Sequence, residues 1–383
     1  MSNVTRGGFL YVVGQLRLGG LERQLYYLLA NLDHKRYRPT VFVWNLDPSD
    51  RYYHAIKALK IEIYGFPREW SSLSKLRGFR NLARNTVPEV IHSYSFFTNF
   101  AAYYAAWGTR AVPIGSIRGD FARAKAESGF MRGALNARWP HCQISNSQRS
   151  ADAAEYATNL FTPRKLFVVR NGLDMSQFRC VDDTPGQRHY VAAVGSLFPV
   201  KRWDRLLRAI QGVKKGMTGE IHFRIAGDGP LRLVLEKQAE ALGISEVVEF
   251  LGAIHDVPAF LREAKFLVHT SESEGCPNVV MEAMACGRAI VAMDAGDIPY
   301  LVEDGETGFV VQQGDEGALV ERISQLLRDE KQWIRMGLAA RAKAERQFGV
   351  EHLVSETLDA YRAAGWKESS AVGARGICTL PTS

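Results

Sequence analysis

The sequence of 383 residues has few of the features that mark secreted, membrane-spanning or metal-binding proteins. Its five cysteines are odd in number and scattered, without the CxxC or Cys/His spacing of a disulfide framework or a zinc site. No apolar run approaches the roughly 18 residues that a membrane-spanning helix needs. The start of the chain lacks a basic region followed by a long apolar stretch, so no signal peptide is expected. We therefore expect a cytoplasmic protein.

The chain also lacks the aromatic and arginine-rich patterns of nucleic-acid-binding modules, although its net charge is +7. Residues 1–180 contain 25 Lys and Arg against 12 Asp and Glu, a net charge of +13, whereas residues 181–383 contain 23 against 29, a net charge of −6. We expect no nucleic-acid partner. The basic half suits an anionic membrane surface, where each basic residue contributes roughly 1 kcal/mol of attraction. A phosphate-bearing ligand or a merely solvated basic surface would also account for it.

What the sequence does contain is an alternation of short β-branched apolar runs with longer amphipathic stretches. This pattern is typical of parallel strands joined by crossover helices, and the chain is long enough for two domains. We predict an α/β protein with two doubly wound, Rossmann-like domains that face each other across a cleft. The predicted strands are 9–13, 40–44, 61–64, 90–93, 112–117, 142–145 and 166–169 in the first domain, and 190–194, 221–226, 247–251, 266–269, 289–292 and 309–311 in the second.

A polar segment rich in Pro and Gly separates the two sets of strands and suits an interdomain linker. We place the N-terminal domain at residues 1–180 and the C-terminal domain at residues 181–350. A helix over 351–366 is expected to pack back toward the N-terminal domain, and the small polar segment 367–383 is expected to be a disordered tail. Because ligands of open α/β sheets bind beyond the carboxyl ends of the strands, the site is expected in the cleft.

The strongest local signal is the segment 271–287, SESEGCPNVVMEAMACG, which follows the predicted strand 266–269. Pro277 suits the first position of a helix, so a helix is expected to begin there, at the carboxyl edge of the second sheet. The amide groups of Asn278 and Val279 would then lie at the positive end of the helix dipole and bind an anion such as a diphosphate. Glu282 lies one turn into this helix, and Glu274 lies on the preceding loop.

The run EGCPNVVMEAMACG resembles the signature of the group 1 glycosyltransferases, the retaining family four, in which seven residues separate two glutamates. Other segments resemble further family motifs in the family order, over about residues 8–365. The resemblance implies the two-sheet fold called GT-B and transfer of a sugar from a nucleotide-diphosphate donor, with UDP as the expected nucleotide. The other matching segments are Gly19-Gly20-Leu21-Glu22, Asn171-Gly172-Leu173-Asp174, Gly195-Ser196-Leu197 with Lys201, 226–230, 250–252 and 304–308.

The resemblance also implies roles for single residues. Glu274 would orient the donor sugar and Glu282 would hold the ribose, while Lys201 would stabilise the negative charge that grows on the departing phosphate. No DxD motif occurs, so neither a metal ion nor another cofactor is expected. The rest of the donor site would consist of Gly19, Gly20, Ser196, Gly275, Pro277, Asn278 and Val279.

The sequence departs from the family pattern near this site. Ser196 stands where many members have Arg, so the diphosphate would rely on Lys201 alone or on another residue such as Arg202. The loop in which many members carry a His reads SIRGD at residues 116–120, so Arg118 or Asp120 would replace that His near the sugar. We assign Arg118 a catalytic role.

Two further positions are informative. His92 matches a His that is common in the family, and we interpret it as a structural histidine. The usual Gly-Gly-x-x-Glu is replaced by the run GDIPY at residues 296–300.

The N-terminal half is left to hold the acceptor, either a saccharide or a lipid-linked saccharide of bacterial surface polysaccharide synthesis. A lipid-linked acceptor would bring the protein to the inner face of the membrane, through basic residues of the segment 60–140. Three alternatives remain open. They are another GT-B enzyme such as a nucleotide-sugar epimerase or a phosphorylase, a catalytically silent nucleotide-sugar-binding subunit, and a protein that binds anionic surfaces through its basic half.

Overall fold

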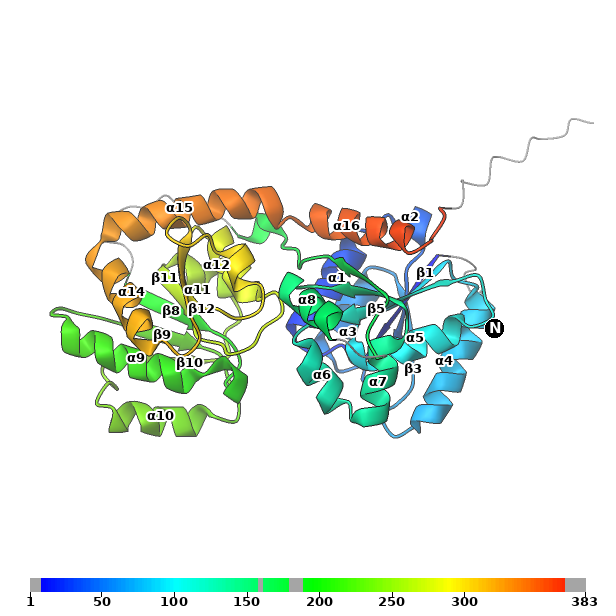
Figure 1. Cartoon of the computed structure of the whole chain (residues 1–383), viewed down its shortest axis with the longest axis horizontal. Helices are drawn as coiled ribbons and strands as arrows, with labels where there is room; N and C mark the ends of the chain where they lie inside the picture. The colour runs from blue at the N-terminus through cyan, green and yellow to red at the C-terminus, as the bar shows by residue number, and fades with distance from the viewer. Residues whose placement is uncertain (1–7, 158–160, 179–188, 369–383) are drawn as a thin grey trace, which may run out of the picture.

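The computed structural model describes residues 8–157, 161–178 and 189–368, which form two α/β domains side by side along the long axis of the molecule (Figure 1). Each domain has a parallel sheet between layers of helices. Strands in such sheets are buried on both faces, which explains near-continuous apolar runs such as FLYVV in β1 (Phe9–Val13) and AIVAM in β12 (Ala289–Met293).

The N-terminal domain contains a seven-stranded sheet with the order β3-β2-β1-β4-β5-β6-β7. Its other strands are β2 (Thr40–Val43), β3 (Glu62–Gly65), β4 (Val90–Ser93), β5 (Val112–Ile117), β6 (Cys142–Ser145) and β7 (Lys165–Val168). Its α-helices are α1 (Gly20–Asn31), α2 (His34–Tyr37), α3 (Arg51–Ala58), α4 (Ser72–Thr86), α5 (Asn99–Ala106), α6 (Phe121–Glu127), α7 (Phe130–Arg138) and α8 (Gln148–Tyr156), with short 3-10 turns at Phe96–Thr98 and Met175–Gln177.

The C-terminal domain contains a six-stranded sheet with the order β10-β9-β8-β11-β12-β13. Its other strands are β8 (Tyr190–Val194), β9 (Phe223–Ala226), β10 (Val248–Gly252), β11 (Ala264–His269) and β13 (Gly308–Val311). Its helices are α9 (Trp203–Gly216), α10 (Arg232–Ala241), α11 (Val257–Arg262), α12 (Asn278–Ala285), α13 (Ile298–Leu301), α14 (Glu316–Arg328) and α15 (Glu330–Gln347), with a 3-10 turn at Pro199–Lys201.

The strand order reverses between β1 and β4 in the first sheet and between β8 and β11 in the second. Open α/β sheets bind ligands at such reversal points, beyond the carboxyl ends of the strands. The loops that leave β8 and β11 carry Lys201 and Glu274 respectively, so the topology alone brings these two residues to one edge of the second sheet.

The chain crosses between the domains twice, after β7 and between α15 and α16 (Val350–Ala363). The two crossing segments are joined by backbone hydrogen bonds, from Leu173 N to Phe348 O at 2.6 Å and from Val350 N to Leu173 O at 3.1 Å. Beyond this junction α16 lies over the N-terminal domain, where Leu353 and Tyr361 join the core formed with β1 and α1 (Figure 1).

The two parallel sheets confirm the predicted fold class, and every predicted strand lies within two residues of an observed one. This accuracy follows from the apolar runs that two-sided burial requires. The predicted domain boundary at residues 180 and 181 lies outside the described residues, as does nearly all of the predicted tail. Within the described ranges, no helix is both long and apolar enough to cross a membrane.

Candidate active site

A pocket of about 360 Å³ lies between the two domains and is lined by residues of both. It is situated at the carboxyl ends of β8 and β11, opposite the first turn of α1. All the residues predicted for the site except Gly19 line it, namely Gly20, Arg118, Ser196, Lys201, Glu274, Gly275, Pro277, Asn278, Val279 and Glu282.

Helix α12 begins at the pocket, one residue later than predicted. Pro277 is the N-cap, with φ −73° and ψ 109°, and Asn278 is the first helical residue. The Asn278 side chain joins the two domains, because its Oδ1 accepts hydrogen bonds from Asn171 Nδ2 at 2.8 Å and from Gln24 Nε2 at 3.2 Å. The amide groups of a first helical turn have no intrahelical acceptors, so this end of α12 offers donors and a positive dipole to an anion.

The two glycines at the start of α1, Gly19 and Gly20, do not act as a pair. A Cβ atom on Gly20 would lie 2.7 Å from Asn278 Nδ2, so glycine leaves room here for the close contact between the domains. Gly19 is the N-cap of α1 and does not line the pocket, and a Cβ atom on it would lie 2.3 Å from the Glu22 carboxylate. The Glu22 carboxylate lies beside Gly19, and the role of Gly19 in donor binding stays a prediction.

Lys201 and Glu274 form an ion pair in the pocket, with 2.6 Å between Nζ and Oε1. The Nε2 atom of His269, at the end of β11, lies 3.1 Å from the same carboxylate oxygen of Glu274. Burial alone would raise the pKa of Glu274, but the hydrogen bond with His269 and the positive charge of Lys201 lower it well below its ordinary value. Glu274 is therefore a carboxylate that accepts hydrogen bonds.

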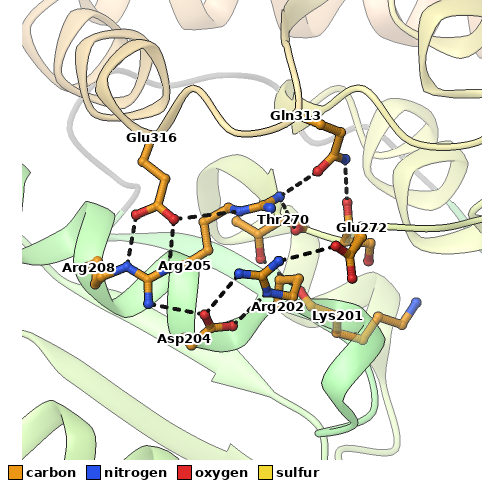
Figure 2. A network of polar contacts seen from close by, with 10 residues as sticks. Lys201, Arg202, Asp204, Arg205, Arg208, Thr270, Glu272, Gln313 and Glu316 are labelled. Carbon is orange, nitrogen blue, oxygen red and sulfur yellow. Dashed lines mark hydrogen bonds and ion pairs between the residues drawn. The ribbon is translucent and has the colours of Figure 1, made fainter.

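The loops that carry Lys201 and Glu274 are tied together through their backbones. Thr270 Oγ1 donates a hydrogen bond to Lys201 O at 3.0 Å, and Glu272 N donates one to Val200 O at 2.9 Å. Beside them, Arg202 pairs with Asp204 and Glu272. Figure 2 shows this network, which extends through Arg205, Arg208, Gln313 and Glu316, with the Lys201 side chain pointing away from it.

Arg202 is not a lining residue of the pocket, and its side chain pairs with Asp204 and Glu272 instead. The suggestion that Arg202 replaces the family's Arg at position 196 is not supported by this geometry. Lys201 is the cation that the described loop after β8 brings to the pocket.

Glu282 has a partner that the sequence did not indicate. Its side chain is only 3% exposed, and its Oε1 accepts a hydrogen bond from the guanidinium of Arg23, which belongs to α1 of the other domain. Although burial alone would lower the pKa of Arg23, the Glu282 carboxylate raises it overall. No local pattern could predict this contact, because the two residues are 259 positions apart and meet only when the domains do.

Arg118 extends from the end of β5 into the pocket, where its guanidinium carbon lies 4.1 Å from the centre of the Tyr94 ring. Its Nε and Nη1 atoms are buried and have no hydrogen-bond partner in the protein. Such buried donors are rare in folded proteins, and they point to a ligand that supplies the acceptors. Asp120 instead caps α6, accepting from Arg123 N at 2.7 Å, so Arg118 is the residue of this loop that faces the site.

His92 is buried, and its ring nitrogens lie 2.7 Å from Tyr361 Oη and 3.1 Å from Ser116 Oγ. Burial and the nearby charge of Arg118 lower its pKa well below the ordinary value. This neutral, fully paired ring matches its interpretation as a structural histidine. A residue missed by sequence reasoning is Asn146, which lines the pocket and has a buried Oδ1 without a hydrogen-bond partner.

The charges of the pocket favour an anionic ligand. Its lining includes the cations Arg23, Arg118 and Lys201 against the carboxylates Glu274 and Glu282. The amino end of α12 adds partial positive charge to this small excess. The site can therefore hold a diphosphate, while its two carboxylates can accept hydrogen bonds from hydroxyl groups.

A larger cavity of about 690 Å³ opens in the N-terminal domain beside the pocket, and Leu21 lines both. It lies beyond the carboxyl ends of β1, β2 and β4. Its wall is largely apolar, with Glu22, Asn45 and Arg132 among its polar groups. The apolar residues include Leu76, Phe97, Phe100, Leu135 and Trp44.

Comparison with known protein families identifies the family to which the chain belongs. A model described as Glycosyl transferases group 1 matches residues 176–343, and one described as Glycosyltransferase Family 4 matches residues 18–177. With the two-sheet fold, these matches show that the chain belongs to the group 1 glycosyltransferases of the GT-B fold. It is an enzyme that transfers a sugar from a nucleotide sugar.

Individual relatives agree with this family. The chain is 26% identical over 357 residues to a Campylobacter jejuni GalNAc-α-(1→4)-GalNAc-α-(1→3)-diNAcBac-PP-undecaprenol α-1,4-N-acetyl-D-galactosaminyltransferase, with 91% of this chain and 96% of the relative covered. The crystal structure of Anabaena Alr3699/HepE in complex with UDP and glucose superposes with a TM-score of 0.78 at 20% identity, covering 93% of this chain and 99% of that one. The structure of sucrose-phosphate synthase from Thermosynechococcus elongatus superposes with a TM-score of 0.76 at 19% identity. The superposition covers 94% of this chain and 99% of that one.

Proposed function

We propose that the protein is a retaining glycosyltransferase that uses a UDP-sugar and transfers the sugar to a saccharide carried on a lipid diphosphate. The observation that carries the proposal is the pocket between the domains, where Lys201, Arg118 and the start of α12 surround Glu274 and Glu282. UDP is favoured because a structural neighbour with the same fold binds UDP and UDP-glucose.

The pocket residues fit the chemistry of this reaction. When the bond between the anomeric carbon and the diphosphate oxygen breaks, negative charge grows on the departing phosphate. The ammonium of Lys201 and the amide groups of α12 stabilise that charge, and the unpaired nitrogens of Arg118 can bind a phosphate oxygen or a sugar hydroxyl. Glu274 accepts hydrogen bonds from hydroxyls of the donor sugar, and Glu282 accepts them from the ribose.

In a retaining transfer the acceptor hydroxyl arrives on the face of the sugar that the diphosphate leaves. We place the acceptor in the larger cavity, because it adjoins the donor pocket at Leu21. Its apolar wall suits a lipid-linked molecule, and the Campylobacter relative is named for an acceptor on PP-undecaprenol. The acceptor would bring the basic N-terminal domain to the inner face of the membrane, in the synthesis of a surface polysaccharide.

Two measurements test this proposal. Calorimetric titration with UDP, GDP, ADP and CMP should show binding of UDP in preference to the others. Hydrolysis of UDP-sugars without acceptor should then release UDP slowly, and NMR of the transfer product should show the anomeric configuration of the donor. Absence of binding by any nucleotide would refute the donor site, and an inverted product would refute retention.

The same assay run with EDTA tests the expectation that no metal is required. Activity should be unchanged, and restoration of a lost activity by Mg²⁺ or Mn²⁺ would overturn that expectation. A saccharide acceptor without lipid should be used less well than its lipid-diphosphate form. Equal use of the two would place the acceptor among soluble saccharides.

A further inference from the structure

Asp297 is a buried carboxylate of the C-terminal domain whose side-chain partners all belong to the N-terminal part of the chain. It precedes α13, and its side chain is 0% exposed. Its Oδ1 accepts hydrogen bonds from Ser147 Oγ at 2.9 Å and from Gln148 N at 2.8 Å, and its Oδ2 accepts one from Arg170 Nε at 2.8 Å. Asp297 therefore caps the amino end of α8 from across the domain interface.

The loop that carries Asp297 also contacts the donor-site loop that carries Glu274. Asp297 N donates a hydrogen bond to Gly275 O at 2.9 Å. The preceding residue, Gly296, has φ +53°, and a Cβ atom on it would lie 2.4 Å from Gly275 O. The side chain of Asp297 is thus linked to the N-terminal domain, and its backbone is linked to the donor loop.

A second departure from the family pattern contacts the same arginine. The ring of Tyr300 lies under Arg170, with 5.1 Å from the guanidinium carbon to the ring centre. Asp297 and Tyr300 are the two positions at which the run GDIPY differs from Gly-Gly-x-x-Glu. Asp297 and Tyr300 therefore both contact the guanidinium group of Arg170.

Arg170 also lies next to the junction at which the chain crosses between the domains, since Leu173 forms the backbone hydrogen bonds to the second crossing segment. A charged contact beside this junction is well placed to restrict the angle between the domains. Because the Asp297 carboxylate is buried and paired with Arg170 and the amino end of α8, water and salt screen it far less than a surface ion pair.

We propose that Asp297 and Arg170 form an interdomain clamp that holds the cleft in its donor-binding arrangement before the donor arrives. Asp297 is a positioning residue, because it acts through the Gly275 loop and has no place in the donor pocket itself. The inference rests on the proposed donor site for its kinetic consequence, but its conformational consequence is independent of that function.

Loss of the clamp is predicted to change the KM for the donor more than the kcat. The apparent dissociation constant of a ligand rises in proportion as the binding-competent state becomes less populated. Loss of the clamp should therefore raise the KM for the donor about tenfold. The kcat should change less than about threefold, because a saturating donor restores the closed arrangement.

The test uses the full chain with Asp297→Gly, which restores the residue of the family pattern, and with Arg170→Gln as a second disruption of the same contact. Arg149→Ala is the matched control, because it breaks an exposed ion pair with Asp294 that also joins the two domains. Small-angle scattering should show a larger radius of gyration for Asp297→Gly and Arg170→Gln without ligand, and UDP should reduce it. The wild type and Arg149→Ala should remain compact with and without UDP.

The outcomes separate the two proposals. If UDP binds but the two variants scatter as the wild type does, or if their kcat falls while the KM is unchanged, the clamp is refuted. If UDP does not bind the wild type, the donor site is refuted, while the ligand-free scattering still decides the clamp. Should Asp297→Gly fail to fold, Arg170→Gln decides the question, since Arg170 is 37% exposed and its replacement leaves Asp297 with its hydrogen bonds from Ser147 and Gln148.

Discussion

Replacement of Lys201 by Ala tests the catalytic chemistry most directly. The side chain is 21% exposed and ends 2.6 Å from Glu274 Oε1, at the edge where the diphosphate is proposed to leave. Loss of one preorganised donor to a developing anion typically costs about 10²- to 10³-fold in kcat, about 2.7 to 4 kcal/mol. We expect Lys201→Ala to lower kcat by that factor and to change the dissociation constant for UDP much less, because most of the phosphate charge develops as the bond breaks.

The ion pair between Lys201 and Glu274 also contributes to the free energy of unfolding, and the direction of its pH dependence follows from the pKa of Glu274. In the wild type the pKa of Glu274 lies below its ordinary value of 4.5, so its contribution to stability is fully present above pH 4.5 and is lost as pH falls below it. Without Lys201 the pKa rises toward the ordinary value, and part of that contribution disappears. We expect the free energy of unfolding to fall by about 1 to 3 kcal/mol at neutral pH. The difference from the wild type should shrink as the pH falls below 4.5.

Initial-rate kinetics, calorimetric titration with UDP and urea unfolding at several pH values measure these effects. Lys201→Arg keeps the charge and should retain part of the turnover, while Lys237→Ala removes an exposed charge of α10 and should match the wild type. The reasoning is refuted if Lys201→Ala keeps kcat within about threefold of the wild type, or if its whole loss appears in KM.

Three other predictions concern the site and its surroundings. Glu282→Gln should weaken UDP binding by about 1 to 3 kcal/mol in calorimetry, through loss of a charged acceptor for the ribose and of the partner of Arg23; an unchanged affinity would remove Glu282 from the donor site. Gly296→Ala should lower the free energy of unfolding by about 1 to 3 kcal/mol in urea titration, because of its φ of +53° and the contact with Gly275 O; wild-type stability would show that the loop adjusts freely. The protein should sediment with anionic vesicles at low salt and less at high salt, since such attraction is screened within about 8 to 10 Å at physiological salt; equal binding to neutral vesicles, or none at low salt, would contradict the membrane proposal.

Local sequence patterns were sufficient to predict the strands and the two parallel sheets of this protein. Two-sided burial of parallel strands produces apolar runs that can be read from the sequence, and β1 and β12 coincide with such runs. The motifs that follow β8 and β11 also needed no tertiary information, because the carboxyl ends of neighbouring parallel strands meet at one edge of a sheet. Lys201 and Glu274 could therefore be assigned to one site from the sequence.

The tertiary structure decided which side chains meet across the domain interface. The sequence indicated neither that Arg23 pairs with Glu282 nor that Asp297 caps α8, because each contact joins residues more than a hundred positions apart. It could not show that Gly19 is covered by Glu22, or that Arg202 turns toward Asp204 while Lys201 faces the pocket. Periodicity and loop motifs report the local burial and backbone geometry of an element. The angle between two domains and the direction of a long charged side chain depend on the packing of the whole chain.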